Sequence, residues 1–316
     1  MADIRGWHES ENVKNTILAE APSASTKPRT PQSLKRLASR AEAPIGVFDS
    51  GLGGLTVVRE LRRRLPHERV VYFGDIARLP YGIKSEKQIR EFSCENTEFL
   101  LKCKVKAIVV ACNSSSSAAY SYLKKNYSVP IIDVIQPAAE KAVSLNRNHK
   151  IGVIATQATV ASKAYEAAIW SIDKKVKVFS QACPLLVPFV EEGVLEGKLI
   201  EMVLTRYLNP ILEHKIDTLI LGCTHYPLLK RVIQKVVGPK VKLIDSAPAA
   251  VGKLKSLLIQ TNGSRSEKKK GDLQVFVSDL PNTFRSVGAR FLGENLNHVK
   301  VVRFQAKVTV NGKWTL

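Results

Sequence analysis

The second half of this chain repeats landmarks of the first, and this repetition limits the folds that it can adopt. Three short stretches return in the same order and at nearly the same spacing. The matched pairs are Ile45-Gly46-Val47 with Ile151-Gly152-Val153, Ala107 to Asn113 with Thr218 to Thr224, and Val129 to Asp133 with Val241 to Asp245. We therefore expect two similar, pseudo-symmetric halves that contribute equivalent loops.

Each half alternates short apolar runs with amphipathic segments. Apolar runs of this length are typical of buried strands, whereas Leu55–Leu65 and Lys87–Leu101 have the apolar spacing of helices. This alternation predicts an α/β fold with mainly parallel sheets. The expected strands are Ile45–Phe48, Val70–Phe73, Ala107–Val110, Ile131–Ile135, Ile151–Ile154, Thr218–Leu221 and Lys242–Ile244.

Two polar stretches help to divide the chain. Residues 1–43 contain prolines among Ser, Thr, Lys and Arg, and we expect them to form a flexible N-terminal extension. Gln260–Asp272 is expected to be an exposed loop. The first α/β domain then comprises residues 44–135 plus 246–316, and the second comprises residues 136–245. Strand-end loops of two facing domains meet across one cleft, so we expect the active site at the domain interface.

Composition limits the partners of the chain. The net charge of +20 is spread along the sequence, and the basic runs Arg62–Arg64 and Lys268–Lys270 have no interleaved aromatic residues. This favours a solvated basic surface over nucleic-acid binding, with attraction of an acidic substrate as the alternative. No apolar run reaches the roughly 18 residues that span a bilayer, and residues 1–20 lack a signal-peptide pattern. Five cysteines argue against a disulfide framework, so we expect a cytoplasmic protein.

Cys112 stands between a predicted strand and a predicted helix. It follows Ala107–Val110 and precedes Asn113 and a run of serines. The positive field at a helix N-terminus is expected to lower the pKa of such a cysteine, and the backbone N–H groups there suit a carboxylate. The alternative is a buried structural cysteine.

Cys223 has the equivalent position in the second half. It follows Thr218–Leu221 and precedes Thr224-His225-Tyr226-Pro227, in which His225 is close enough in sequence to assist ionisation of the thiol. Racemisation needs two acid/base groups on opposite sides of one carbon, because one removes the α-proton while the other delivers a proton to the opposite face. The duplicated cysteines therefore favour a racemase over a hydrolase with a single nucleophile.

Two other predicted strand ends carry polar residues. Asp49-Ser50 opens a glycine-rich turn, where Asp49 is a candidate for receiving a substrate ammonium or tuning a thiol, with helix capping as the alternative. Asp75 follows the next strand, and Tyr81-Gly82 lie in a turn just behind it. The glycine-rich turn lacks the dinucleotide pattern and a Walker A lysine. No residue set has the spacing of a zinc or calcium site, so neither a cofactor nor a metal is expected.

Together these motifs resemble the bacterial glutamate racemases of the aspartate/glutamate racemase family. The resemblance implies two α/β domains with the active site between them. It also implies interconversion of L-glutamate and D-glutamate without a cofactor or metal, which supplies D-glutamate for peptidoglycan. The resemblance covers residues 44–305 and is carried by Asp49 to Leu55, Pro80-Tyr81-Gly82, Ala111-Cys112-Asn113, Cys183-Pro184, Val190 to Gly193 and Gly222 to Pro227.

The resemblance also assigns roles to residues. It implies that Cys112 and Cys223 are the two bases, acting on the D-enantiomer and the L-enantiomer respectively. Asp49 and His225 would support the thiols, and Asp75 and Glu191 would complete the polar network. The implied substrate-binding residues are Asp49, Ser50, Tyr81, Gly82, Asn113, Ser114, Thr224 and His225.

The chain departs from the family pattern at Ser114, Asp133 and Ala155, which bears on fine tuning of substrate binding more than on the reaction. Two alternatives stay open: a racemase of another acidic amino acid such as aspartate, and a non-catalytic binding protein. Glutamate is the expected small-molecule partner, and neither a membrane nor nucleic acid is expected. A homodimer is considered, but the sequence does not decide the oligomeric state.

Overall fold

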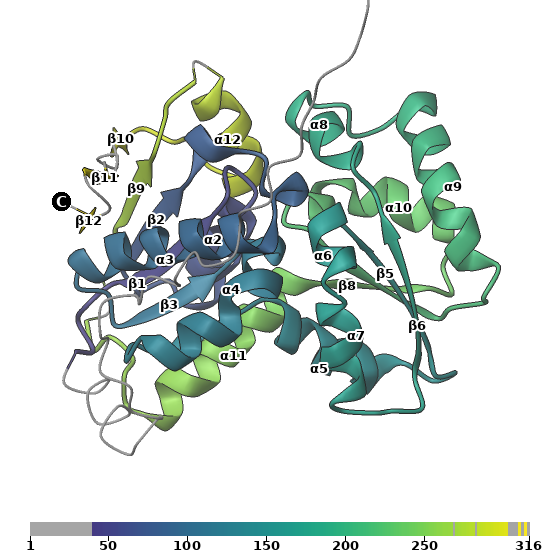
Figure 1. The fold of residues 1–316 in the computed structure, drawn as a ribbon, viewed down its shortest axis with the longest axis horizontal. Helices are drawn as coiled ribbons and strands as arrows, with labels where there is room; N and C mark the ends of the chain where they lie inside the picture. Colours follow the sequence, from purple (N-terminus) through teal and green to yellow (C-terminus); the bar gives the residue numbers. More distant parts are fainter. Residues whose placement is uncertain (1–39, 268, 282, 303–308, 311–312, 315–316) are drawn as a thin grey trace, which may run out of the picture.

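A computed structural model describes residues 40–267, 269–281, 283–302, 309–310 and 313–314. Its larger sheet has six parallel strands in the order β10-β9-β2-β1-β3-β4 (Figure 1). The strands are β1 (Ile45–Asp49), β2 (Val70–Gly74), β3 (Ala107–Val110), β4 (Ile131–Ile132), β9 (Leu273–Val277) and β10 (Val299–Val301). A separate antiparallel pair is formed by β11 (Thr309–Val310) and β12 (Lys313–Trp314).

The smaller sheet has four parallel strands in the order β6-β5-β7-β8. They are β5 (Lys150–Ala155), β6 (Lys177–Ala182), β7 (Thr218–Gly222) and β8 (Lys242–Asp245). This order repeats the order β2-β1-β3-β4 of the larger sheet, strand for strand. The predicted α/β fold with two similar halves and mainly parallel sheets is therefore confirmed, and the internal sequence repeat has a structural counterpart.

Helices surround both sheets, and two of them lie where the chain passes between the halves. Helices α5 (Ile135–Leu145) and α11 (Ser246–Gln260) pack against each other at this junction (Figure 1). The larger sheet carries α2 (Leu55–Arg64), α3 (Glu86–Lys102), α4 (Asn113–Asn126) and α12 (Phe284–Leu292), with the 3-10 turns η1 (Ile76–Arg78) and η2 (Tyr81–Ile83). The smaller sheet carries α6 (Gln157–Ala161), α7 (Ala164–Trp170), α8 (Leu186–Glu191), α9 (Lys198–Leu212), η3 (Tyr226–Leu229) and α10 (Lys230–Val237).

One predicted strand is wrong in length, and three strands of the two parallel sheets were not predicted, nor was the β11–β12 pair. The run Ile131–Ile135 was expected to be extended throughout, but the strand ends at Ile132 and Ile135 begins α5. Asp133 causes this change, because its Oδ2 accepts hydrogen bonds from the backbone N–H groups of Ile135 and Gln136, both at 2.9 Å. The unpredicted strands of the parallel sheets are β6, β9 and β10, which lie toward sheet edges and are less completely buried than β1 or β3.

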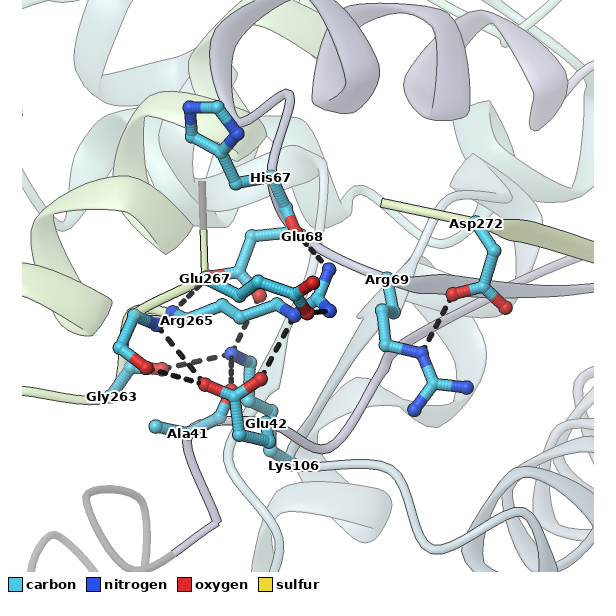
Figure 2. Close-up of polar contacts among 11 residues, drawn as sticks. Ala41, Glu42, His67, Glu68, Arg69, Lys106, Gly263, Arg265, Glu267 and Asp272 are labelled. Atoms are coloured by element: carbon cyan, nitrogen blue, oxygen red, sulfur yellow. Dashed lines mark hydrogen bonds and ion pairs between the residues drawn. The ribbon is translucent and has the colours of Figure 1, made fainter. Parts of the chain in front are cut away.

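A buried lysine anchors the edge of the larger half, at the amino end of β3 (Figure 2). The Lys106 side chain is fully buried, and its Nζ lies 2.6 Å from a carboxylate oxygen of Glu68. The same Nζ donates to the carbonyl oxygen of Gly263 at 2.9 Å and also to that of Ala41. Gln260–Asp272 was expected to be an exposed loop, and it is exposed over most of its described residues, but Gly263 is buried at this anchor.

The predicted extension of residues 1–43 lies outside the described residues except for its last four. Within those four, Glu42 forms an ion pair with Arg265 at 2.9 Å. No helix in the described parts of the chain has the length and apolar character needed to cross a membrane. All five cysteines lie in described parts and are free.

Candidate active site

The two cysteines of interest occupy equivalent places in the two sheets. Cys112 is separated from the end of β3 by Ala111 and is the N-cap residue of α4, while Cys223 directly follows β7. Strands β3 and β7 pair in the same way with β1 and β5 of their own sheets. Both cysteines are buried, with 5% and 6% of their surface exposed. The carboxyl ends of parallel strands are where α/β proteins commonly bind ligands.

The strand-end loops of the two halves touch each other beside Cys223. The Thr56 hydroxyl in α2 donates to the carbonyl oxygen of Thr224 at 3.3 Å. A Cβ atom on Gly53 would lie 2.1 Å from the Thr224 hydroxyl oxygen and 2.6 Å from Nδ1 of His225. Only glycine permits this approach. The glycine-rich turn after β1 therefore packs directly on the Cys223 loop, and the site lies between the halves as expected from the repeat.

Cys112 lies in an apolar and partly anionic environment. Its Sγ donates to the hydroxyl oxygen of Ser50 at 3.6 Å. Burial, together with the negative charge of Asp49, raises the pKa of Cys112 to about 11, although hydrogen bonds from Ser115 and Ser50 oppose the rise. The expectation that the N-terminus of α4 would lower this pKa is therefore wrong for the substrate-free protein, because loss of hydration outweighs the helix field.

Asp49 is completely buried beneath the glycine-rich turn. Its Oδ2 accepts a hydrogen bond from the backbone N–H of Gly51 at 3.0 Å, and Oδ1 has no hydrogen-bond partner among the described residues. Burial raises the pKa of Asp49, while His225 and the backbone N–H groups of Gly51 and Gly54 oppose the rise. A buried carboxylate with a free oxygen is suited to an ammonium group. Asp49 is not the N-cap of α2, which is Gly54.

His225 links Cys223 to a carboxylate. Its Nδ1 lies 3.9 Å from Sγ of Cys223, and its Nε2 lies 3.0 Å from Oε1 of Glu191. Burial by itself lowers the pKa of His225, but its interactions with Cys223 and Glu191 outweigh burial and raise this pKa to about 10. His225 is then an imidazolium near neutrality, with both ring nitrogens as donors. The imidazole ring of His225 and the ring of Phe291 pack in a T-shaped arrangement, with their centroids 5.0 Å apart.

A group of three hydroxyls spans the two halves near Cys112. The Ser114 hydroxyl oxygen, in α4, lies 3.0 Å from that of Thr156 and 3.5 Å from that of Thr159. Thr156 caps α6, and its hydroxyl lies 3.1 Å from that of Thr159. Sequence reasoning missed both threonines as site residues. The repeat carries a signal for Thr156, which follows β5 as Ser50 follows the equivalent β1, but it carries none for Thr159.

Tyr81 and Asp75 form a buried polar network beside the Gly82 turn. The Tyr81 hydroxyl donates to Oδ2 of Asp75 and accepts from the Asn96 amide at 3.3 Å. Arg78 donates to the same Asp75 oxygen at 2.7 Å. The Tyr81 hydroxyl is thus engaged by Asp75 and Asn96, while the side chain belongs to the same apolar cluster as Cys112. A Cβ on Gly82 would lie 2.9 Å from Cβ of Thr156. The Gly82 backbone is therefore the part of this turn that lies beside the cluster of three hydroxyls described above.

The remaining predicted residues fall in the same region. Asn113 is 3% exposed and begins α4, and its Nδ2 has no hydrogen-bond partner within the described structure. Thr224 is 5% exposed and its hydroxyl lies 3.5 Å from Nδ1 of His225. Across the described residues, no group of three or more His, Cys, Asp or Glu side chains is arranged to hold a metal. The site therefore offers two thiols, an imidazolium, a buried carboxylate and several neutral donors.

Known racemases resemble this chain in sequence and in fold. Residues 53–254 match the family described as Asp/Glu/Hydantoin racemase. Over 260 residues, the chain is 46% identical to the glutamate racemase of Syntrophus aciditrophicus (strain SB), which covers 82% of this chain and 96% of the relative.

Two solved structures of glutamate racemases are also similar. The Francisella tularensis enzyme in complex with D-glutamate aligns with a TM-score of 0.79 and 41% identity, over 83% of this chain and 98% of that one. The Escherichia coli enzyme in complex with L-glutamate and the activator UDP-MurNAc-ala aligns with a TM-score of 0.66 and 27% identity, over 82% and 98% of the two chains.

Proposed function

The chain belongs to the Asp/Glu/Hydantoin racemase family, and we propose that it interconverts L-glutamate and D-glutamate. Its relatives of 41% and 46% identity are glutamate racemases, and the former has been solved with D-glutamate bound. The observation that carries the proposal is the pair of buried cysteines at equivalent strand ends of two similar sheets. The D-glutamate produced is proposed to supply peptidoglycan synthesis.

The proposed reaction moves one proton at a time. A cysteine thiolate takes the α-proton of glutamate and becomes a thiol, which leaves a carbanion at the α-carbon. The thiol of the other cysteine then protonates the opposite face and becomes a thiolate. The configuration at the α-carbon is inverted, and the enzyme is left in the state that accepts the product as substrate for the reverse reaction.

We assign Cys223 as the base for L-glutamate and Cys112 as the base for D-glutamate, as the resemblance to the glutamate racemases implies. With a pKa of about 11, Cys112 carries its proton near neutrality. It can therefore serve as the acid when L-glutamate is converted to D-glutamate. His225, with a pKa of about 10, places a positive charge 3.9 Å from the sulfur of Cys223. Glu191 holds that imidazolium in place at 3.0 Å. A two-base racemase uses one sulfur as the base and the other as the acid in each direction.

The binding roles follow from the same contacts. We assign the substrate ammonium to Asp49, whose Oδ1 has no partner among the described residues. The two carboxylates of glutamate need donors, which we assign to Ser50, Asn113, Ser114, Thr224 and the Gly82 backbone, with the imidazolium of His225. Tyr81 and Asp75 are assigned to support of the Gly82 turn. Thr156 and Thr159 join this set through their contacts with Ser114.

Replacement of either cysteine by serine tests the two-base assignment. Cys112→Ser and Cys223→Ser should each lower kcat in both directions by a factor of about 10² to 10⁴, because each direction uses both sulfurs. Circular dichroism starting from each enantiomer measures the rates. Cys103→Ser, at a half-buried cysteine that ends α3, is the matched control and should keep full activity. Full activity of either site variant contradicts the assignment.

Aspartate is the second candidate substrate, because the description of the matched family includes it. A side chain shorter by one methylene would use the same two sulfurs but would place its second carboxylate differently. Racemisation rates for both amino acids at equal enzyme concentration separate the two. We expect a higher kcat/KM for glutamate, and a higher value for aspartate would change the substrate while keeping the mechanism.

A further inference from the structure

Tyr165 connects the two halves at the site, although neither the sequence motifs nor the roles proposed above include it. It lies in α7 of the smaller half and is 1% exposed. Its hydroxyl donates to Oδ1 of Asn113 at 2.7 Å. Asn113 begins α4 in the larger half and directly follows Cys112. The hydrogen bond therefore joins α7 to the loop that carries Cys112.

The ring of the same tyrosine packs against the other cysteine loop. A Cβ atom on Gly222 would lie 2.9 Å from Cε2 of Tyr165, which is closer than side chains approach in practice. Gly222 ends β7 and directly precedes Cys223. One buried side chain thus contacts the immediate neighbours of both cysteines, by its ring on one side and by its hydroxyl on the other.

The hydrogen bond from Tyr165 to Asn113 also determines which amide atom of Asn113, Oδ1 or Nδ2, is left without a partner. With Oδ1 facing Tyr165, Nδ2 is buried and has no partner among the described residues. A reversed amide would leave both its oxygen and the phenolic hydrogen without partners, so the observed orientation leaves fewer polar groups unpaired. Leaving a buried donor unpaired is costly, which suits an N–H group that is satisfied when a ligand acceptor arrives.

The hydroxyl of Tyr165 is protonated and can therefore donate a hydrogen bond. Burial, reinforced by the negative charges of Asp133 and Cys223, raises the pKa of Tyr165 well above its usual value. The phenol therefore holds its proton more firmly than an exposed tyrosine does. A serine or water in the same place would have no such fixed orientation, because neither is held by a ring packed on Gly222.

We propose that Tyr165 is a positioning residue for racemisation. It fixes the positions of the two cysteine loops relative to each other, and it directs Nδ2 of Asn113 at a carboxylate of the substrate. This inference rests on the proposed function. The hydroxyl acts on substrate binding through Asn113, and the ring fixes the spacing between the loops of Cys112 and Cys223. The two parts of the side chain are therefore separable by mutation.

Tyr165→Phe removes the hydroxyl and keeps the ring. We expect KM for both glutamate enantiomers to rise roughly 3- to 10-fold, the scale of one lost hydrogen bond, while kcat changes less than about twofold. The melting temperature identifies any general loss of structure. Tyr127→Phe is the matched control, because it removes a tyrosine hydroxyl that lies 3.3 Å from Glu98 at the other end of α4. Both kinetic constants should be unchanged in the control.

A double-mutant cycle shows whether Tyr165 works through Asn113. Asn113→Ala should raise KM by itself, and adding Tyr165→Phe to it should cause no further rise. If the two effects multiply, or if Tyr165→Phe leaves KM unchanged in an active enzyme, the inference is overturned. A purely structural role for Tyr165 would lower stability in both backgrounds without this dependence.

Two further results separate the inference from the proposed function. If the unaltered protein does not racemise glutamate, the proposed function fails, and the inference is judged by calorimetric Kd values for glutamate across the same cycle. If Tyr165→Phe does not fold, Asn113→Asp replaces it, because Asp keeps an acceptor for Tyr165 and loses the Nδ2 donor. Asn113→Asp must then raise KM, and an unchanged KM overturns the inference.

Discussion

At Cys112 and Asp49, burial opposes ionisation of two groups that the proposed reaction needs. Asp49 is fully buried, and its negative charge adds to the burial that raises the pKa of Cys112 to about 11. Bound substrate would change this balance, because an ammonium group near Asp49 would offset the carboxylate charge. The substrate itself would then help to ionise the sulfur that deprotonates it, which limits the reactivity of the empty site.

The effect of Asp49 on Cys112 is measurable in the absence of substrate. Asp49→Asn removes a negative charge that favours the neutral thiol, so the pKa of Cys112 should fall. The pH midpoint of Cys112 alkylation, followed by mass spectrometry of its peptide, should move to lower pH. Asp133→Asn, which alters the buried cap of α5, is the control and should leave the midpoint in place. A midpoint that rises in Asp49→Asn would contradict the electrostatic account.

Glu191 should control the protonation of His225. Glu191→Gln removes an anion 3.0 Å from Nε2, so the imidazolium is less favoured and the pKa of His225 should fall below about 10. In the unaltered protein the raised pKa contributes stability that is complete below about pH 6.5 and is lost as the pH rises through about 10.

In Glu191→Gln this loss of stability should begin at the same pH, because the pKa of His225 in the unfolded chain sets its onset, but it should end at lower pH and be smaller in total. The unfolding free energy from urea titrations between pH 6 and pH 10.5 measures the shift, and the alkaline limb of kcat/KM for L-glutamate should move in the same direction. Glu192→Gln, at the C-cap position that follows α8, is the control. If both variants show the pH dependence of the unaltered protein, Glu191 is not the partner that holds the proton on His225.

At the scale of elements, the turn after β1 packs closely against the loop after β7, and Gly53 lies at the contact. Gly53→Ala places a methyl group 2.1 Å from the Thr224 hydroxyl and 2.6 Å from the His225 ring. We expect a loss of about 1–3 kcal/mol in unfolding free energy from overpacking and at least a tenfold loss of kcat, because His225 must move.

Gly252→Ala is the matched control for that glycine. It lies inside α11, and the nearest atom to its new methyl group is Nη1 of Arg64 at 3.7 Å. Replacing a helical glycine where there is space stabilises a protein by about 0.4–1 kcal/mol, and the activity should be unchanged. Denaturant titration and the racemisation assay, applied to both variants, check the pair. Equal behaviour of the two would show that the Gly53 contact is not needed.

The sequence predicted the elements whose signals are local. The strand before Cys112 and the helix after it were found because four apolar residues are followed by a polar, serine-rich segment. The end of β4 was missed because it depends on a side chain, that of Asp133, which caps α5 instead of continuing the strand. The edge strand β6 was missed because it mixes Lys177, Ser180 and Gln181 with apolar residues.

The site was predicted where the chain repeats and missed where contacts cross between the halves. The pair Cys112 and Cys223 follows from the repeat and Asp75 from its place after a predicted strand, whereas Glu191 was reached only through resemblance. Thr156 and Thr159 carry no local indication of a site, because their role depends on meeting Ser114 from the other half. Tyr165 was missed for the same reason, since its partner Asn113 is 52 positions away.

At the scale of the whole molecule, charged side chains are buried away from the site as well as within it. Lys106 joins three parts of the chain, those of Ala41, Glu68 and Gly263, at the amino end of the strand that leads to Cys112 (Figure 2). Charged residues are expected at the surface, so its full burial was not predictable from the sequence. The three contacts satisfy the ammonium, which is the condition for burying a charge.

Lys106→Met should therefore destabilise the protein strongly. Removing one partner of a buried pair leaves Glu68 uncompensated, and we expect a loss of about 3–5 kcal/mol in unfolding free energy. Lys253→Met, which breaks an exposed pair with Glu140 at 3.4 Å, should cost less than about 1 kcal/mol. The double variant Lys106→Met/Glu68→Leu should recover part of the loss. Urea unfolding checks all three, and equal values for the two single variants would contradict the role of Lys106.

The central claim is that two sulfurs from two similar halves exchange the α-proton of glutamate with solvent. Incorporation of deuterium at the α-carbon, followed by NMR in D₂O with purified protein and no added cofactor, tests it most directly. The account predicts α-deuterium in D-glutamate formed from L-glutamate and in L-glutamate formed from D-glutamate, with loss of optical activity. Retention of the α-proton in the product, or no exchange with either enantiomer, would contradict it.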